Sequence, residues 1–339
     1  MAAWGTAVTI AAFWALIPLS MWGVAGAEAL AGMPFLANDA VTPPDLGLTL
    51  APLAAALGFI GWRAKALPMQ TQWTIGCVLG LISVVALHSL YKQAWGITSL
   101  LAFEHYGMGE RTIWQALLML AAYALWQFGP KLAARIMSAP AARYAALAAA
   151  GLALAHFTWF TLFLHNPLLT PQHVGPTPIA NWLTLAYVTA IAGLWMVSQI
   201  ARQQWPSMPA ITHHIVQGVM MGLITLLGFS LLRQIFAGSV LTFLRISQNE
   251  SLLISLLGIV IAIGFLAWGS MRDERSWRIG SLVLMLGAVC KVFLIDAAVL
   301  DGLLRIASFM ALGFSLIGIG WVYARQLKRR EAPDTTEPA

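Results

Sequence analysis

Four charged residues near the C-terminus could bind a ligand or lock two helices together. They are two bases and two acids: Lys291, Asp296, Asp301 and Arg305. Asp301 and Arg305 are four residues apart, so they share a face of a helix and can pair. Charges are costly inside a bilayer, so these four are expected to be buried against protein and paired. The pattern predicts either a helical hairpin locked by two ion pairs, or a ligand or head-group site on the same residues.

A second polar group lies between two apolar segments in the first third of the sequence. Its members are Lys92, Glu104, His105, Glu110 and Arg111. Carboxylates beside a histidine could transfer protons to or from a substrate or bind a divalent metal ion. The spacing matches no metal motif, and adjacent residues such as Glu104 and His105 do not face each other on a helix. We therefore interpret this segment as an exposed polar loop, with acid–base chemistry as the alternative.

The remaining histidines carry weaker signals. His156, His165 and His173 could converge on a metal ion, but the prolines that follow them chiefly indicate a rigid, non-helical connection. His213 and His214 begin an apolar segment and are interpreted as interfacial residues. The sequence contains no phosphate-binding Gly–Lys motif, no Gly-x-Ser-x-Gly elbow and no HExxH motif. It therefore predicts no cofactor and no metal site.

The composition determines the environment in which these residues must be positioned. Of the 339 residues, 60% are hydrophobic and only 9% are charged, whereas a soluble domain has about 25% charged residues. Soluble enzymes, disordered proteins and collagen-like chains are excluded, because the exterior of a soluble fold must be solvated. The net charge of +6 forms no soluble basic patch, so no nucleic-acid partner is expected. Membrane lipids are the expected surroundings.

Apolar segments predict about ten membrane spans. Every backbone polar group in hydrocarbon must be hydrogen-bonded within its own segment, so the spans are helices and the fold class is an all-α polytopic transmembrane bundle. The bundle forms one domain over residues 1–325, followed by a basic and then disordered cytoplasmic tail at 326–339. The predicted spans are 4–25, 46–62, 72–90, 112–128, 142–164, 179–199, 213–232, 251–270, 277–295 and 302–324.

The distribution of basic residues predicts the orientation. If the C-terminal arginines and lysine lie in the cytoplasm, thirteen of the 19 basic residues fall in cytoplasmic loops and four in outer loops. This bias follows the positive-inside rule and places both termini in the cytoplasm of a bacterial inner membrane. Eight of the 13 acids and the longest connections then fall on the outer side. Since long loops commonly carry sites, we expect any functional site at the outer leaflet.

The last third of the sequence resembles a known family. The segments that carry the resemblance are 277–280 (WRIG), 291–296 (KVFLID), 300–309 (LDGLLRIASF), 318–323 (GIGWVY), 233–238 (RQIFAG) and 166–169 (NPLL). They resemble the bacterial membrane-protein family catalogued as domain of unknown function 2339, convincingly over about residues 150–325. The resemblance implies a many-helix envelope protein, often much longer, and brings no settled activity. The polar residues that fit the family pattern are Asn166, Arg233, Glu250, Lys291, Asp296, Asp301 and Arg305.

Three functions remain open at this point. The first is a polar site at the outer leaflet that handles a lipid-linked or cell-envelope glycan substrate, by binding or by transfer chemistry. The second is a transporter or flippase, although deep polar residues such as Gln115 and Thr184 are few. The third is a non-catalytic scaffold that packs against other membrane proteins. The expected binding residues are Lys291, Asp296, Asp301, Arg305, Arg233, Glu250, Asn166 and His105, with Arg233, Glu250 and His105 lining one cavity beside the last hairpin.

Overall fold

The computed structural model has two compact units, each described here by itself. The first comprises Met1–Ile200 and Ser239–Phe243, and the second Ala201–Gly238 and Leu244–Ala339. The residues that the structure describes are 2–63, 68–132, 139–207, 209–242, 244–296 and a few positions between 310 and 321. Within these ranges the fold is all-α, and the β-pairing consists of an isolated bridge between His173 and Val240. The all-α part of the predicted fold class is confirmed, whereas the orientation of the termini stays a prediction.

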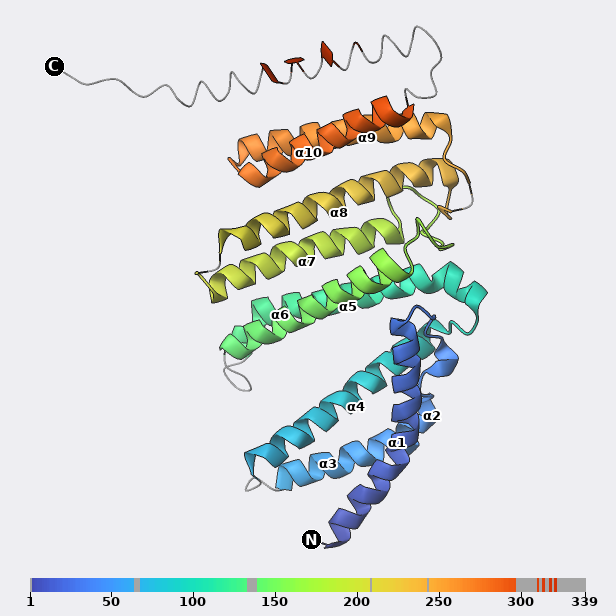
Figure 1. The fold of residues 1–339 in the computed structure, drawn as a ribbon. Coiled ribbons are helices and arrows are strands. Elements are labelled where there is room, and N and C mark those ends of the chain that lie inside the picture. The colour runs from blue at the N-terminus through green and yellow to red at the C-terminus, as the bar shows by residue number, and fades with distance from the viewer. Residues whose placement is uncertain are drawn as a thin grey trace, which may run out of the picture. The chain divides into compact units, whose positions relative to one another are not determined.

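Long helices make up the first unit (Figure 1). They are α1 (Ala2–Leu30), the short α2 (Pro43–Asp45), α3 (Ala51–Arg63), α4 (Met69–Trp95), α5 (Leu100–Leu132), α6 (Ala139–His156) and most of α7 (Trp182–Gln204). Pro68 precedes α4, and Gly96 ends it in a left-handed conformation with φ 62°, which glycine adopts without steric cost. α5 and α6 pack along each other through buried small residues such as Ala122, Ala146 and Ala150.

The second unit contains α8 (Ala210–Ala237), α9 (Gln248–Met271) and α10 (Arg275–Lys291). Ser247 begins α9 as its N-cap, because its hydroxyl accepts the backbone N–H of Glu250 at 3.2 Å. α9 and α10 lie side by side (Figure 1). A Cβ at Gly269 would lie 2.9 Å from the backbone nitrogen of Arg278, so the turn between these helices requires a residue without a side chain.

Three helices depart from α-helical geometry at the ends predicted to face outward. π-helical turns occupy η2 (Leu46–Leu50), η3 (Phe157–Leu164) and η4 (Val292–Asp296). The π-helix is rare and occurs frequently at functional sites. A single turn of 3₁₀-helix, η1 (Ala37–Asp39), lies in the connection between α1 and α2.

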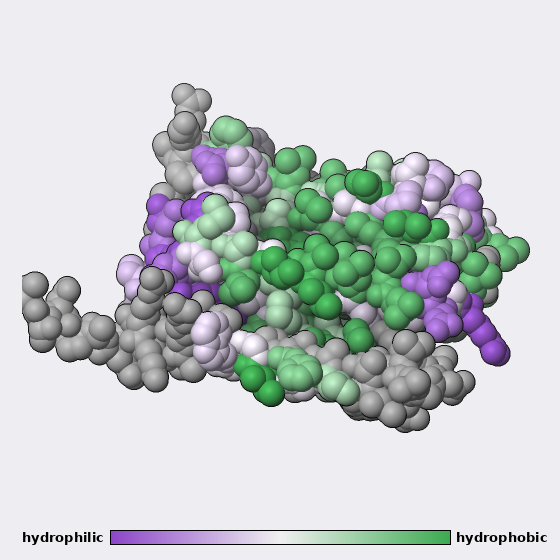
Figure 2. Space-filling view, turned by 90° about the horizontal axis from the view of Figure 1, so that it is seen from above, coloured by the Kyte–Doolittle hydropathy of each residue, from purple (hydrophilic) through white to green (hydrophobic). Residues whose placement is uncertain are grey.

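Eight helices in the described part of the chain are long and apolar enough to cross a membrane. Figure 2 shows hydrophobic side chains across the middle of one face, with hydrophilic side chains toward its two ends. The protein is therefore a multi-pass membrane protein. The predicted span at 112–128 lies inside α5, which is long enough at 33 residues, or about 50 Å, but is not among the eight. The predicted span at 302–324 lies almost entirely outside the described residues.

Candidate functional site

The most enclosed polar segment of the first unit lies on α5. Residues 107–112 are all buried, and because six residues exceed one helical turn, protein surrounds the helix on every side. A Cβ at Gly109 would lie 3.0 Å from the Trp182 ring, so this glycine permits the close approach of the first residue of α7. Two of the enclosed residues are charged: Glu110 is 2% exposed and Arg111 is 5% exposed.

Glu110 forms an ion pair with Lys92 of α4. The carboxylate Oε1 contacts Lys92 Nζ, and both side chains are buried. Lys92 also donates a hydrogen bond to the backbone oxygen of Phe35 at 3.0 Å, and the neighbouring Gln93 donates to the oxygen of Ala37 at 2.8 Å. Lys92 therefore joins three segments of the unit: α4, α5 and the connection that follows α1. The second carboxylate oxygen of Glu110, Oε2, is buried and has no hydrogen-bond partner among the described residues.

Arg111 is held by contacts that leave part of its guanidinium unsatisfied. Its Nη2 donates to Gln172 Oε1 at 3.0 Å, and its Cζ lies 5.2 Å from the centroid of the Phe103 ring. Its Nε and Nη1 are buried without a hydrogen-bond partner in the described part of the chain. A buried charged group without a partner costs free energy, so each such group in a folded protein calls for water or a ligand.

Three histidines lie within electrostatic range of Lys92: His88, His156 and His165. His88 accepts a hydrogen bond from Trp22 Nε1 at 3.1 Å, and His156 Nδ1 is buried and unpartnered among the described residues. The His165 ring lies edge-on to Phe103, with centroids 5.0 Å apart. Burial, together with the charges of Arg111 and Lys92, lowers the pKa of His165 to about 4. His165 is therefore neutral at pH 7 and adds no further positive charge.

We define the polar cluster as Lys92, Glu110, Arg111, His156, His165 and Gln172. Its charged members are two cations and one anion, which leaves one positive charge in excess. It also presents unpartnered donors on Arg111 and an unpartnered acceptor on Glu110. This arrangement can bind a negatively charged polar group. In the described part of the chain, no three His, Cys, Asp or Glu side chains group closely enough to hold a metal ion.

The proline-rich connection between η3 and α7 positions Gln172. His173 donates its backbone N–H to the oxygen of Glu104 at 2.9 Å, and Val174 donates to the oxygen of Ser239 at 2.9 Å. Gln172 is thereby fixed against α5, and the predicted non-helical connection is confirmed. The ring of His105 contacts that of His173 at a tilt of 55°, with centroids 4.5 Å apart. The side chain of His105 is exposed, outside the polar cluster.

A second buried charged group lies in the second unit. Arg233 of α8 pairs with Glu250 at the start of α9, and its Nη2 donates to the backbone oxygen of Leu244. Lys291, at the end of α10, donates to Ser251 O at 2.8 Å, Ser251 Oγ at 3.0 Å and Ser255 Oγ at 2.8 Å. These contacts join the ends of α8, α9 and α10 that are predicted to face outward.

The structure describes only some of the other predicted site residues. Asn166 forms a turn after η3, since its Oδ1 accepts from Leu168 N at 2.9 Å and its Nδ2 donates to Leu162 O at 3.0 Å. Asp301, Arg305 and the side chain of Asp296 lie outside the described residues. The single cavity predicted for His105, Arg233 and Glu250 stays a prediction, because these residues belong to two units described separately.

The predicted exposed loop at 91–111 is wrong. α4 continues to Trp95 and α5 begins at Leu100, so Glu104, His105, Glu110 and Arg111 are helical, and the last two are buried. Pairing with Lys92 and Gln172 replaces the water that these charges would need in a loop. The sequence marked both charged residues but did not distinguish a solvated loop from an enclosed helix.

Comparison with known proteins identifies the family. The family model described as "Predicted membrane protein (DUF2339)" matches residues 1–326, which extends the resemblance to the part of the chain that carries the polar cluster. No curated protein and no solved structure matches the chain. A match over nearly the whole chain shows that the protein belongs to the DUF2339 family of predicted multi-pass membrane proteins.

Proposed function

We propose that this protein resides in the bacterial inner membrane and binds the anionic head group of a lipid-linked envelope substrate at the outer leaflet. The polar cluster of the first unit is the proposed binding site, and Arg111 is its principal contact. The proposal concerns binding, because the cluster supplies charge and hydrogen-bond donors and contains no activated nucleophile.

One observation carries the proposal: Arg111 is 5% exposed, and the buried Nε and Nη1 of its guanidinium have no hydrogen-bond partner among the described residues. These two nitrogens carry three N–H donors. Glu110, the adjacent acid, is paired with Lys92 instead. A phosphate would satisfy the free donors and balance the excess positive charge, and arginine is well suited to phosphate recognition.

The position of the cluster supports a lipid-linked substrate. Lys92 lies near the end of α4 and Arg111 in the N-terminal half of α5, both at the side that the basic-residue bias predicts to be outer. A head group attached to a hydrocarbon chain would reach this level of the bilayer while its chain remained among the lipids. The π-helical segment η3 ends one residue before His165, and such segments occur frequently at functional sites.

A binding measurement tests the proposal. The purified protein in detergent is titrated with a polyisoprenoid phosphate and with the matching neutral polyisoprenol, and the bound lipid is measured by native mass spectrometry. We expect the phosphate to bind more tightly than the alcohol. We also expect Arg111→Gln to weaken phosphate binding by at least about tenfold, the equivalent of one charge-assisted hydrogen bond.

Two further variants make the result decisive. Arg245→Gln removes a positive charge from the second unit, and we expect it to leave phosphate binding unchanged. Arg111→Lys retains the charge but lacks the guanidinium donors, and we expect intermediate binding. If wild-type protein binds the alcohol as tightly as the phosphate, or if folded Arg111→Gln binds the phosphate as wild type does, the proposed function is wrong.

A second candidate, transfer of the head group across the membrane, is favoured by one specific observation. Gln115 lies one turn beyond Arg111 on the same face of α5, and its Oε1 is buried without a hydrogen-bond partner among the described residues. The Oγ1 of Thr184 on α7 is likewise buried and unpartnered within those ranges. If Gln115→Leu abolishes movement of the lipid between leaflets of a vesicle but leaves binding intact, this second function is supported.

A further inference from the structure

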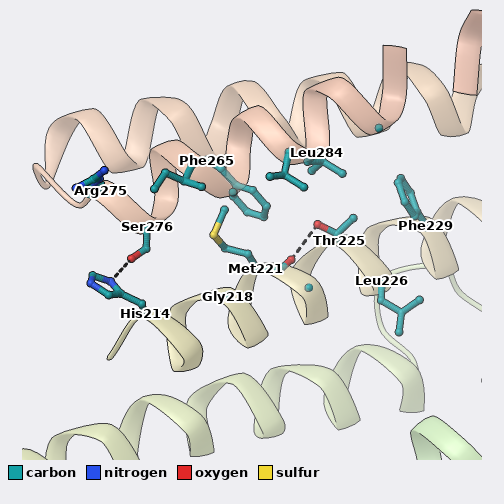
Figure 3. A pocket seen from close by; sticks show the side chains of 15 residues that line it. His214, Gly218, Met221, Thr225, Leu226, Phe229, Phe265, Arg275, Ser276 and Leu284 are labelled. Carbon is teal, nitrogen blue, oxygen red and sulfur yellow. Dashed lines mark hydrogen bonds between the residues drawn. The ribbon is translucent and has the colours of Figure 1, made fainter. Parts of the chain in front are cut away.

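A groove of about 1030 Å³ lies between α8 and α10 in the second unit (Figure 3). Its walls are apolar: Met221 and Phe229 come from α8, Phe265 from α9, and Val283 and Leu284 from α10. In Figure 3 the side chains of Met221 and Phe265 point toward each other from opposing helices. The volume is at the upper end of the range for sites that bury a small ligand.

Glycines create much of this space. Gly218 and Gly222 of α8 and Gly287 of α10 line the groove, and no heavy atom lies within 4 Å of the position that a Cβ would occupy at any of them. Side chains are therefore absent from these parts of the groove wall, which leaves room for a hydrocarbon chain.

One end of the groove is polar. His214 and Ser276 are hydrogen-bonded there, with Nδ1 and Oγ 2.5 Å apart, and Arg275 lies beside them (Figure 3). Arg275 is exposed and forms no hydrogen bond or ion pair within the part of the chain that the structure describes. The nearby acids are already paired: Asp273 with Arg278 at 3.1 Å, and Glu274 with His213 at 3.5 Å.

The start of α10 adds further positive potential at this end. α10 begins at Arg275, and its N-cap residue, Glu274, forms no side-chain hydrogen bond to the first turn. The free N–H groups of a helix N-terminus favour an anion. Together, Arg275 and the helix terminus form a cationic end on an otherwise apolar groove, at the side that the basic-residue bias predicts to be cytoplasmic.

We propose that this groove binds one anionic phospholipid of the cytoplasmic leaflet. The phosphate contacts Arg275 and the first turn of α10, and an acyl chain lies along Gly218 and Gly222. Charge complementarity selects this occupant, since basic pockets between transmembrane helices on the cytoplasmic side bind anionic lipid head groups. The site is distinct from the polar cluster of the first unit and does not depend on the function proposed for it.

Lipid binding to the purified, full-length protein tests the proposal. Native mass spectrometry in detergent compares phosphatidylglycerol with phosphatidylcholine of the same acyl chains. We expect wild-type protein to prefer phosphatidylglycerol and Arg275→Gln to lower that affinity about fivefold, the effect expected of one basic residue near anionic lipid. Arg272→Gln is the matched control, because Arg272 stacks over the Trp268 ring, 4.9 Å from its centroid, and does not line the groove.

A second pair of variants tests the apolar channel. A Cβ at Gly222 would meet no heavy atom within 4 Å and would extend into the groove, so we expect Gly222→Leu to prevent binding of the phospholipid. A Cβ at Gly264 on α9 likewise meets nothing within 4 Å, but this residue does not line the groove, so Gly264→Leu should leave binding unchanged. Equal binding of both lipids to wild-type protein, or wild-type binding by Arg275→Gln or Gly222→Leu, would overturn the proposal.

Cross-linking distinguishes the other occupants. In a variant with both native cysteines replaced, Gly222→Cys is combined with single cysteines in residues 302–324. A disulfide between these positions means that the chain itself fills the groove, and a disulfide between two copies of Gly222→Cys means that a second protein does. Either result overturns the lipid assignment, whereas protection of Gly222→Cys from alkylation by added phosphatidylglycerol supports it.

Discussion

Arg233 donates from a single nitrogen, Nη1, to both carboxylate oxygens of Glu250, at 2.9 and 2.7 Å. Arg233 is 8% exposed and Glu250 is 1% exposed. The two residues are 17 positions apart in the sequence, and the connection between α8 and α9 brings them together. A buried ion pair of this kind fixes which helices meet and leaves a costly charge behind if one partner is lost.

We therefore expect the single variants Arg233→Met and Glu250→Leu each to destabilise the protein by about 3–5 kcal/mol, with the double variant Arg233→Met/Glu250→Leu much less affected. Thermal unfolding in detergent measures the difference. Arg278→Gln is the control, since its partner Asp273 is exposed and such pairs contribute at most about 1 kcal/mol. Additive losses in the double variant would show that the two residues act independently.

The turn between α9 and α10 should tolerate no side chain at position 269. A Cβ there would lie 2.8 Å from the Cβ of Trp277 and 2.9 Å from a backbone nitrogen, so Gly269→Ala is expected to cost about 1–3 kcal/mol. Gly264→Ala, on the same helix, meets nothing within 4 Å and should be neutral or gain up to about 1 kcal/mol. The two melting temperatures in the same detergent provide the comparison, and equal values would contradict it.

The first unit should lose stability in mild acid because of His165. Its pKa falls from 6.5 to about 4 in the folded protein, chiefly through burial and secondly through the charges of Arg111 and Lys92. Below pH 6.5 the unfolded state binds more protons, so stability decreases as the pH falls from about 6.5 to 4.

Thermal unfolding at pH 7.5 and pH 5 checks this effect. His165→Phe keeps a ring against Phe103 and removes the titrating group, so its melting temperature should change less between the two pH values than that of wild type. His105→Phe, at an exposed position, should behave as wild type. A variant His165→Phe with the full acid sensitivity would exclude His165 as its source.

The predicted orientation can be tested by reporters at two loops. A fusion after His173 should report the outer compartment, and a fusion after Arg275 should report the cytoplasm, because basic residues gather in the loops predicted to be cytoplasmic. A periplasm-active enzyme and a cytoplasm-active fluorescent protein at each position give opposite readings. The same compartment at both positions would show that the order of spans is wrong.

The sequence predicted the helical class because a long apolar segment in hydrocarbon has few structural options. The predicted spans at 142–164 and 277–295 correspond closely to the observed Ala142–Leu164 and Arg275–Ile295. By contrast, the sequence does not indicate the pairing of Lys92 with Glu110. That pair depends on how α4 and α5 pack, and the charges alone suggested a solvated loop.

The candidate site was predictable only in part, because its contacts also depend on how the helices pack. The family resemblance marked Arg233 and Glu250, and the structure shows what each contacts. A pairing of Lys291 with Asp296 or Asp301 stays a prediction, because those side chains lie outside the described residues. The described contacts of Lys291 are hydrogen bonds to Ser251 and Ser255. Serines on an apolar helix carry no sequence signal for this role. Nor does the sequence reveal the groove beside Arg275, since the residues that line it come from three separate helices.

The enclosed segment of α5 has a consequence for how the protein is made. A helix that carries Glu110 and Arg111 partitions poorly into a bilayer by itself, because each charge costs about 2.5–3.5 kcal/mol on insertion scales. The partners that satisfy these charges, Lys92 and Gln172, lie on either side of α5 in the sequence. We therefore expect stable integration of α5 to depend on a segment synthesised after it, the connection that carries Gln172.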